Sequence, residues 1–157
     1  ITFYEGGEVG VLHVDVTNPY CTSVCQHLKE TAGRLQIGVH SKGTYVCTEG
    51  PRYETAAEIR MFQMLGGDLV GMTSVPEVVL AREVGLCYAT LALVTNYAAG
   101  ISPNPLSHRE VVEVMGKSQA VLRRLIFAAI ESLPEQRSCT CMTAAAELGS
   151  LGLKKEN

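Results

Sequence analysis

Residues 45–97 read YVCTEGPRYETAAEIRMFQMLGGDLVGMTSVPEVVLAREVGLCYATLALVTNY. Three apolar runs lie in this stretch, at Tyr45–Cys47, Leu69–Met72 and Leu86–Val94. Helical patterns fill the two intervals, at Thr55–Leu65 and in the residues that follow Ser74. This order of strand, helix, strand, helix, strand is typical of a parallel sheet with crossover helices. We therefore predict an α/β fold, in which a mixed, mainly parallel sheet is flanked by helices.

Three helix starts share one local signature, a hydroxyl residue followed three positions later by glutamate. The three are Thr55–Glu58, Ser74–Glu77 and Ser107–Glu110. In such a capping box the hydroxyl accepts a hydrogen bond from a backbone N–H, and the carboxylate bonds back to the cap. The last helix is predicted at about His108–Ser132. An earlier helix is predicted at Asn18–Gly33, because asparagine caps well and proline is tolerated at the first helical position.

The composition limits the class of protein. The chain has 157 residues, 46% hydrophobic and 18% charged, which is enough for one domain with a substantial core. A net charge of −3 argues against nucleic acid as the main partner. No apolar run approaches the roughly 20 residues of a membrane span, and no signal peptide is visible. We expect a cytoplasmic protein without a membrane partner, with an ordered domain over residues 1–135 and a weakly ordered tail over residues 136–157.

Six cysteines call for separate interpretations. Cys47 and Cys87 fall in predicted strands, where a thiol is most simply a small buried hydrophobic group. Cys21 and Cys25 are predicted to share one face of a helix, but zinc needs two more ligands that the sequence does not place, so no metal site is predicted. The tail motif Cys139–Cys141 is either a redox-active or structural dithiol, or a pair of exposed thiols without a role.

Polar and aromatic residues follow the three predicted strands. In parallel sheets, ligands bind beyond the carboxyl ends of the strands. A mixture of carboxylate, amide, hydroxyl and aromatic groups at this edge suits a polar, ring-shaped small molecule. The residues expected there are Glu49, Arg52, Tyr53, Glu54, Met72, Thr73, Asn96 and Tyr97.

Two kinds of recognition are possible at this edge. Thr73 directly precedes a helix, and a hydroxyl beside unpaired backbone N–H groups favours an anion such as phosphate. The alternative is that Ser74 caps the helix and Thr73 only fills space. Glu54 can accept from a ring N–H, and Asn96 can both donate and accept, so together they can read the edge of a purine. The alternative is that Glu54 is a solvated acid of the first turn and Asn96 a turn residue.

The remaining candidates also have two interpretations. Tyr53 and Tyr97 can flank a ring or line a sugar, although tyrosines are more often partly buried packing. His108 opens the last helix, where the simplest interpretation is a solvent-exposed histidine. His13 lies on the face of Val9–Val16 opposite its apolar residues, so it can meet another subunit.

Three segments identify a family resemblance. His40–Thr55, Gly71–Ala89 and Leu93–Ser102 closely resemble the trimeric purine nucleoside phosphorylase and methylthioadenosine phosphorylase family, and the resemblance extends from Ile1 to about Glu135. It implies a pentosyltransferase of purine salvage. In such enzymes inorganic phosphate, a co-substrate, attacks C1′ of a purine nucleoside and displaces the base, giving α-ribose 1-phosphate. No further cofactor is implied.

The resemblance assigns roles position by position. Asn96 resembles the residue that hydrogen-bonds N7 and O6 of the base, and Glu54 the carboxylate that receives N1–H. These two are the expected catalytic residues. Tyr53 resembles the aromatic residue that packs on base or sugar, and Met72 the methionine under the ribose.

Three further positions match the ends of the ligand. Thr73 resembles the hydroxyl residue that binds phosphate, and His108 the histidine near the ribose 5′-hydroxyl. His13 matches a position that reaches the 5′ end of a ligand in a neighbouring subunit. The resemblance therefore implies a homotrimer, or a hexamer built from trimers.

The base-reading pair favours one subclass. Members that cleave methylthioadenosine typically carry serine after the aromatic residue and aspartate at the second position, whereas this chain has Glu54, Asn96 and Ala98. That arrangement resembles the members specific for 6-oxopurines, with inosine and guanosine as substrates. A methylthioadenosine or methylthioinosine phosphorylase is the alternative. The Cys139–Cys141 motif resembles the tails of thermophilic archaeal members, where it accompanies disulfides.

One part of the family pattern is not found. Family members carry, upstream of the matched region, a first strand with a glycine-rich phosphate loop, an Arg-His segment that binds phosphate and a strand that contacts ribose and base. We therefore expect this chain to be the C-terminal portion of a nucleoside phosphorylase domain, with the N-terminal strands absent, and to be inactive alone. The alternative of another class is a non-catalytic fragment.

Overall fold

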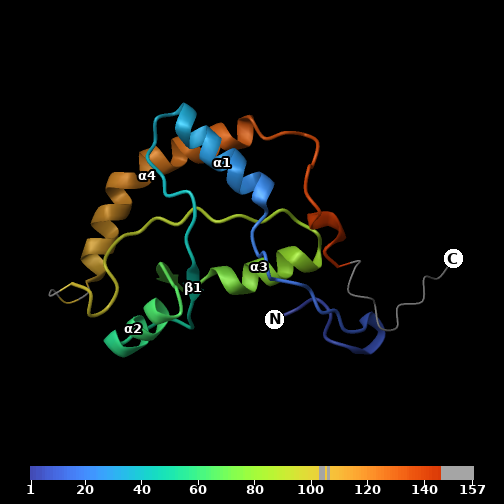
Figure 1. Ribbon diagram of the computed structural model, residues 1–157, viewed down its shortest axis with the longest axis horizontal. Helices are drawn as coiled ribbons and strands as arrows, with labels where there is room; N and C mark the ends of the chain where they lie inside the picture. Colours follow the sequence, from blue (N-terminus) through green and yellow to red (C-terminus); the bar gives the residue numbers. More distant parts are fainter. Residues whose placement is uncertain (103–104, 106, 146–157) are drawn as a thin grey trace. The chain divides into compact units, whose positions relative to one another are not determined.

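A computed structural model describes residues 1–102, 105 and 107–145 of the chain. Its helices and strands are labelled in Figure 1 where there is room. No helix in these ranges is long and apolar enough to cross a membrane. The elements are η1 (Gly7–Val9), α1 (Thr22–Arg34), β1 (Tyr45–Cys47), α2 (Ala56–Met64), β2 (Leu69–Gly71), α3 (Ser74–Glu83), α4 (His108–Glu131) and η2 (Cys141–Thr143).

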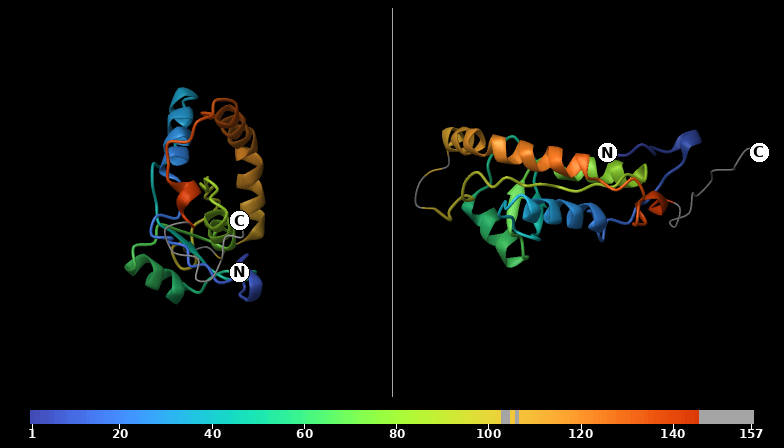
Figure 2. Two further views of the ribbon diagram at one scale, coloured as in Figure 1. Left: turned by 90° about the vertical axis from the view of Figure 1, so that its right-hand side faces the viewer. Right: turned by 90° about the horizontal axis from the view of Figure 1, so that it is seen from above.

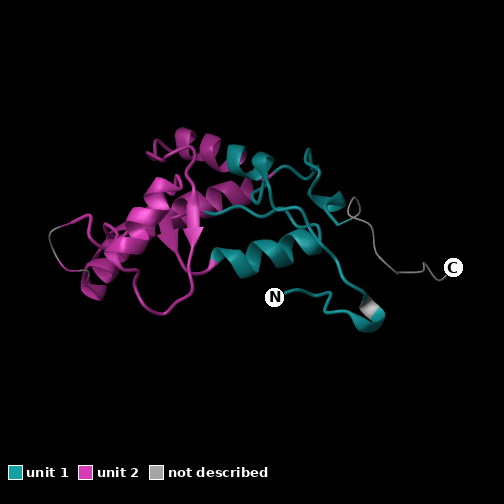
Figure 3. Ribbon diagram, turned by 60° about the horizontal axis from the view of Figure 1, so that its bottom comes forward, with its two compact units in different colours: residues 1–26, 74–90, 134–157 teal, residues 27–73, 91–133 magenta. Residues whose placement is uncertain are grey.

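These elements belong to two compact units, coloured separately in Figure 3. Unit 1 contains residues 1–26 and 74–90 and the described residues from 134 onward. Unit 2 contains residues 27–73 and the described residues of 91–133. Each unit therefore combines segments that are far apart in the sequence. The extent of the predicted domain, residues 1–135, stays a prediction.

The parallel sheet lies in unit 2. Strands β1 and β2 pair in parallel, with Tyr45 opposite Leu69 and Cys47 opposite Gly71, and α2 connects them. The α/β class is confirmed, and the sheet has two strands among the described residues. Because the two strands run in the same direction, their carboxyl ends, and the residues that follow, lie at one edge of the sheet.

The predicted third strand is wrong. Residues 86–95 pair with no other strand in the described part of the chain. A strand is defined by backbone hydrogen bonds to a neighbour, whereas an apolar run reports only which side chains are suited to burial. In the structure Leu86 is 52% exposed and Val94 is 67% exposed. Although this segment is apolar, it forms no strand in the described part of the chain.

The capping box of α2 is confirmed. Thr55 Oγ1 accepts from the backbone N–H of Glu58 at 3.2 Å, and Glu58 Oε2 accepts from the backbone N–H of Thr55 at 2.7 Å. Arg52 donates to both carboxylate oxygens of Glu58, at 2.9 and 2.6 Å. This arrangement fixes the loop that connects β1 to α2.

The other two predicted boxes differ in their outcome. Helix α4 begins at His108 as predicted, and Ser107 Oγ accepts from the backbone N–H of Glu110 at 3.2 Å. Ser74, by contrast, is the first residue of α3 rather than the residue before it, and it is buried. Ser74 is therefore the first residue of the helix and not the residue that caps it.

The C-terminal part of α1 packs against α4 in unit 2, as Figures 1 and 2 show. His27 Nε2 lies 2.9 Å from the carbonyl oxygen of Ala129, and Arg34 donates to Ser132 Oγ at 2.9 Å. Ala32 and Leu125 are buried there. This pair of helices supplies much of the buried apolar surface of unit 2.

The start of α1 was predicted too early. The helix begins at Thr22 rather than at Asn18. The backbone N–H of Cys21 donates to the carbonyl oxygen of Tyr88 at 2.7 Å. This bond holds Cys21, the residue directly before the helix, against the segment that contains Tyr88. The carbonyl oxygen of Cys21 accepts from the backbone N–H of Cys25 at 2.9 Å, so the two cysteines lie one helical turn apart.

Unit 1 is organised around α3. Glu83, near the end of this helix, is buried and accepts from Thr2 Oγ1 at 2.5 Å and from the backbone N–H of Phe3 at 2.7 Å. These bonds attach the first residues of the chain to the helix. The tail predicted at residues 136–157 contains a short 3₁₀ helix, η2, at Cys141–Thr143, in which Cys141 is buried. Residues 146–157 lie outside the described ranges.

The Arg52–Glu58 ion pair gives a pH-dependent contribution to stability. The hydrogen bonds from Arg52, followed by those from Thr55, lower the pKa of the Glu58 carboxyl from its ordinary 4.5 to about 2. Since the folded-state pKa is lower than the unfolded one, the contribution is present above about pH 4.5 and is lost as the pH falls toward 2. In urea unfolding, Glu58→Gln is expected to lower the midpoint near pH 6, with the difference from wild type shrinking near pH 2.

A matched control uses the other partner. Arg52→Gln removes the guanidinium and leaves the capping box intact, so the Glu58 pKa, followed by carbon-13 NMR, is expected to rise toward its ordinary value. A stability difference between wild type and Glu58→Gln that is unchanged between the two pH values contradicts this account.

Candidate functional site

Glu54 is the buried acid at the carboxyl edge of the sheet. Its side chain is 9% exposed, and its Oε1 accepts from Thr48 Oγ1 at 2.6 Å. Thr48 directly follows β1, and its backbone N–H donates to the carbonyl oxygen of Gly71 in β2 at 2.8 Å. The same residue therefore continues the ladder and holds the carboxylate. No donor among the described residues bonds Oε2 of Glu54, so this oxygen is available to a ligand.

The sequence analysis missed Thr48. The position of Thr48 could have identified it as a site residue. It is the first polar residue after β1 and therefore lies where ligands of parallel sheets bind. A threonine in that place also has the one donor that a neighbouring carboxylate can accept. Its longer contact to the Gly71 carbonyl oxygen, at 3.3 Å, leaves the bond to Glu54 as the stronger of the two.

Met72 lies at the same edge, directly after β2, and is half-buried. A Cβ atom on Gly50 would lie 2.7 Å from Met72 Sδ and 3.7 Å from Met72 Cβ. The loop that contains Gly50 and Glu54 therefore lies against the methionine, and glycine leaves room for this approach. The structure thus brings the loops after β1 and β2 together, as the parallel order predicts.

Thr73 completes the segment after β2. It is exposed, and its hydroxyl makes no hydrogen bond to the described residues. The next residue, Ser74, begins α3. A free hydroxyl directly before a helix is compatible with the predicted anion contact, which stays a prediction.

Asn96 is held in one orientation by its neighbours. Its Nδ2 donates to the backbone carbonyl oxygen of Tyr97 at 2.9 Å, and its Oδ1 accepts from Thr95 Oγ1 at 2.7 Å. Because a carbonyl can only accept, the amide atom that faces Tyr97 must be the nitrogen. The amide oxygen accepts from Thr95 through one of its two lone pairs, and the second N–H of Nδ2 makes no hydrogen bond to the described residues. Asn96 therefore has a donor available to a ligand.

The segment that carries Asn96 packs against the start of α2. A Cβ atom on Gly100, where φ is +76°, would lie 2.5 Å from Ala56 Cβ and 3.4 Å from its Cα. Ala56 is two residues after Glu54, so the third predicted loop reaches the region of the first. The Glu54 and Asn96 side chains make no hydrogen bond to each other, as far as the described residues show. A ligand that contacts both must lie between them.

The structure places the other predicted residues without joining them to this group. Tyr53 is 43% exposed and Tyr97 is 69% exposed. His108, at the start of α4, is exposed. In unit 1, His13 is exposed while the neighbouring Leu12 is half-buried, which agrees with the predicted outward face. The roles of these four residues stay predictions.

Comparison with known proteins matches the chain to the Phosphorylase superfamily over residues 1–131. The chain is 61% identical over 147 residues to a probable 6-oxopurine nucleoside phosphorylase of Moorella thermoacetica, covering 94% of this chain and 56% of the relative. It is 50% identical to a probable S-methyl-5'-thioinosine phosphorylase of Thermodesulfovibrio yellowstonii, covering 91% and 53%.

A comparison with solved structures also finds nucleoside phosphorylases. A methylthioadenosine phosphorylase from Schistosoma mansoni in complex with adenine superposes with a TM-score of 0.83 at 30% identity, covering 94% of this chain and 58% of that structure. The chain thus spans little more than half the length of the proteins it matches.

Proposed function

The chain belongs to the phosphorylase superfamily, and we propose that it forms the base-recognising part of a 6-oxopurine nucleoside phosphorylase. The reaction is phosphorolysis of inosine or guanosine to the free base and α-ribose 1-phosphate, with inorganic phosphate as co-substrate. The observation that carries this proposal is the donor orientation of the Asn96 amide, in a segment that contacts the start of α2 two residues after Glu54. The relative from Moorella, whose name states the same specificity, supports it.

The two side chains complement a 6-oxopurine. Such a base presents N1–H as a donor and O6 and N7 as acceptors. The available Oε2 of Glu54 accepts from N1–H, and the remaining N–H of Asn96 donates to N7 and O6. Adenine instead presents a lone pair at N1 and an amine at C6. The carboxylate would meet the lone pair at N1 and be left unpaired, and the amide donor would keep N7 but meet the 6-amino group in place of O6.

The same geometry assists bond cleavage. A phosphate oxygen attacks C1′ while the C1′–N9 bond breaks, and its electron pair passes to the purine through an oxocarbenium-like state. Negative charge then develops on the leaving base, at N7 and O6 among other atoms. A donor already fixed at N7 stabilises that charge without reorganisation. In this proposal Thr73 contacts phosphate, Met72 lies under the ribose, and Tyr53 packs on the base or sugar.

A methylthioinosine phosphorylase is the second candidate, because a relative with that name is 50% identical to the chain. Hypoxanthine is the base in both cases, so Glu54 and Asn96 do not separate the two substrates. The difference lies at the 5′ end of the ribose, where His108 and a neighbouring subunit's His13 are proposed to lie. We accordingly propose a cytoplasmic homotrimer, or a hexamer of two trimers, which native mass spectrometry of the completed enzyme tests.

The direct test is a base-release assay on a completed enzyme, in which the part of the Moorella relative that this chain does not cover precedes residue 1. Phosphate-dependent release of base is measured from inosine, guanosine, adenosine, methylthioadenosine and methylthioinosine. We expect inosine and guanosine to exceed adenosine by about 100-fold, from the few kcal/mol that unpaired buried groups cost. Preferential release of adenine from methylthioadenosine would refute the base assignment.

The chain without this addition is expected to release no base. This comparison also tests the alternative of a non-catalytic fragment. If the completed enzyme is folded and trimeric but inactive, while the intact Moorella relative is active, the proposed function is wrong.

Thr48 is predicted to act as a positioning residue for Glu54. Thr48→Val keeps the shape but removes the donor to Glu54 Oε1. The expected result is a 10-fold to 100-fold loss of kcat/KM for inosine, mostly as a higher KM, since hydrogen bonds to charged groups contribute about 1.5–3 kcal/mol. Thr48→Ser restores the donor and is expected to restore activity.

A matched control lies at the other end of β1. Thr44 is exposed and bonds through its backbone, because its N–H donates to Asp68 and its carbonyl oxygen accepts from the N–H groups of Asp68 and Leu69. Its hydroxyl makes no hydrogen bond to the described residues. Thr44→Val is therefore expected to leave the KM for inosine unchanged. If Thr48→Val behaves like Thr44→Val, Thr48 does not position the carboxylate.

A further inference from the structure

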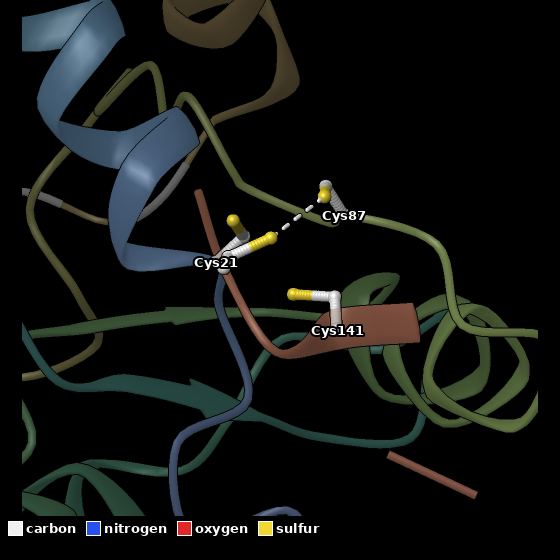
Figure 4. Close-up of side chains that lie close together, drawn as sticks. Cys21, Cys87 and Cys141 are labelled. Atoms are coloured by element: carbon white, nitrogen blue, oxygen red, sulfur yellow. Dashed lines mark hydrogen bonds between the residues drawn. The ribbon is translucent and has the colours of Figure 1, made fainter. Parts of the chain in front are cut away.

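Four thiols of unit 1 form a cluster. The sulfur atoms of Cys21, Cys87, Cys139 and Cys141 all lie within 4.8 Å of one another. Cys21 and Cys141 are buried, and the other two are half-buried. Figure 4 shows the labelled side chains of Cys21, Cys87 and Cys141 converging from three separate segments of the chain. The predictions treated these cysteines separately, and the structure brings them together.

Contacts that do not involve the sulfur atoms hold these segments in place. The N–H of Cys21 donates to the carbonyl oxygen of Tyr88 at 2.7 Å. Arg137 donates to the carbonyl oxygen of Gly85 at 3.1 Å. A Cβ atom on Gly85, where φ is +68°, would lie 3.1 Å from Met142 Cα, so η2 packs directly on this turn. The four thiols are therefore positioned by the fold itself.

The dimensions of the cluster suit a tetrahedral metal ion. Zn–S bonds of about 2.3 Å place the four sulfurs of a tetrahedral site about 3.8 Å apart. The sulfurs here lie within 4.8 Å, with Cys87 and Cys139 at 3.3 Å, so shifts of about 1 Å or less produce the site.

The ligand set indicates which metal and which role. Four cysteines without histidine, carboxylate or an open position are typical of structural zinc, and thiolates select zinc over magnesium or calcium. The other two cysteines, Cys25 and Cys47, are not members of the cluster. The chain therefore contains its own controls.

We propose that Cys21, Cys87, Cys139 and Cys141 bind one structural zinc ion as thiolates. Four Zn–S bonds form, four thiol protons are released to solvent, and no atom changes oxidation state. The ion links the start of α1, the turn after α3 and the C-terminal segment of unit 1. This role is separate from base recognition, whose residues lie in unit 2 apart from His13.

The test uses the chain as printed, purified with a reductant and equilibrated with zinc. Mass spectrometry of metal content is expected to find one zinc per chain. Substitution by Co²⁺ is expected to give the visible absorption of tetrahedral cobalt with sulfur-to-metal charge transfer. Cys21→Ser and Cys141→Ser are each expected to lower bound zinc at least tenfold. Cys25→Ser and Cys47→Ser are expected to keep it.

Alkylation of the wild-type chain gives a readout that does not depend on the folding of variants. With zinc bound, a thiol reagent is expected to modify Cys25 and Cys47 and to spare the cluster until a chelator is added. If no zinc binds and the cluster is alkylated under reducing conditions, the proposal is wrong. If the cluster resists alkylation until disulfides are reduced, and zinc does not bind afterwards, the thiols form disulfides and the proposal is also wrong.

Discussion

Asn96→Asp is expected to shift the completed enzyme from 6-oxopurines toward 6-aminopurines. Asn96 Nδ2 donates one N–H to Tyr97 and has a second N–H for the base. The substitution replaces this donor by a carboxylate oxygen, which repels N7 and O6 unless the carboxylate is protonated. We expect kcat/KM for inosine to fall about 100-fold to 1,000-fold, the usual cost of losing one donor to a developing negative charge. Activity on adenosine is expected to rise, because a protonated aspartate donates to N7 and its other oxygen accepts from the 6-amino group.

The control makes the same chemical change elsewhere. Asn18 is exposed in unit 1, so Asn18→Asp adds the same charge without touching the proposed base site. Its ratio of inosine to adenosine activity is expected to equal that of wild type. An unchanged ratio in Asn96→Asp would show that Asn96 does not read the base.

Glu54→Gln is expected to weaken recognition of N1–H. The substitution keeps the shape of the side chain and removes the charge that Thr48 Oγ1 and the base both approach. The expected loss in kcat/KM for inosine is about 10-fold to 100-fold, since hydrogen bonds to charged groups contribute about 1.5–3 kcal/mol. Adenosine is expected to lose less, because the glutamine amide can turn its NH₂ group toward the N1 lone pair. The ratio of the two activities is the measurement.

Glu131, at the end of α4, provides the matched control for this prediction. It is exposed, and its side chain makes no hydrogen bond to the described residues. Glu131→Gln is expected to change neither activity. An equal loss for inosine and adenosine in Glu54→Gln would point to a damaged loop rather than to base recognition.

Local chemistry explains which features the sequence predicts well. The capping box at Thr55 and the start of α4 at His108 depend on residues within one helical turn, and both are confirmed. The parallel pair β1 and β2 follows from the order of its elements. The false strand at Leu86–Val94 needed a partner backbone, which no pattern within those residues can report.

In the candidate site, too, some features follow from the order of the elements and others depend on tertiary contacts. The edge that holds Glu54 and Met72 follows from parallel strand order, whereas the bond from Thr48 depends on how one loop folds back. The four-thiol cluster joins positions 66 and 52 residues apart, through Cys21, Cys87 and Cys139. No local spacing encodes this cluster. The four-residue spacing of Cys21 and Cys25 points instead to Cys25, which is not a member of the cluster.

The threonines beside the two residues proposed to read the base also bear on the entropy of ligand binding. Thr48 and Thr95 are β-branched, so their χ1 angles are stiff, and each directs its single O–H to one side chain of the pair. A rotamer-rich side chain ordered by a ligand costs about 0.5–1.5 kcal/mol. Here the rotamers of Glu54 and Asn96 are restricted during folding, before any nucleoside arrives. In the proposed site, the two polar side chains are therefore preorganised before a nucleoside binds.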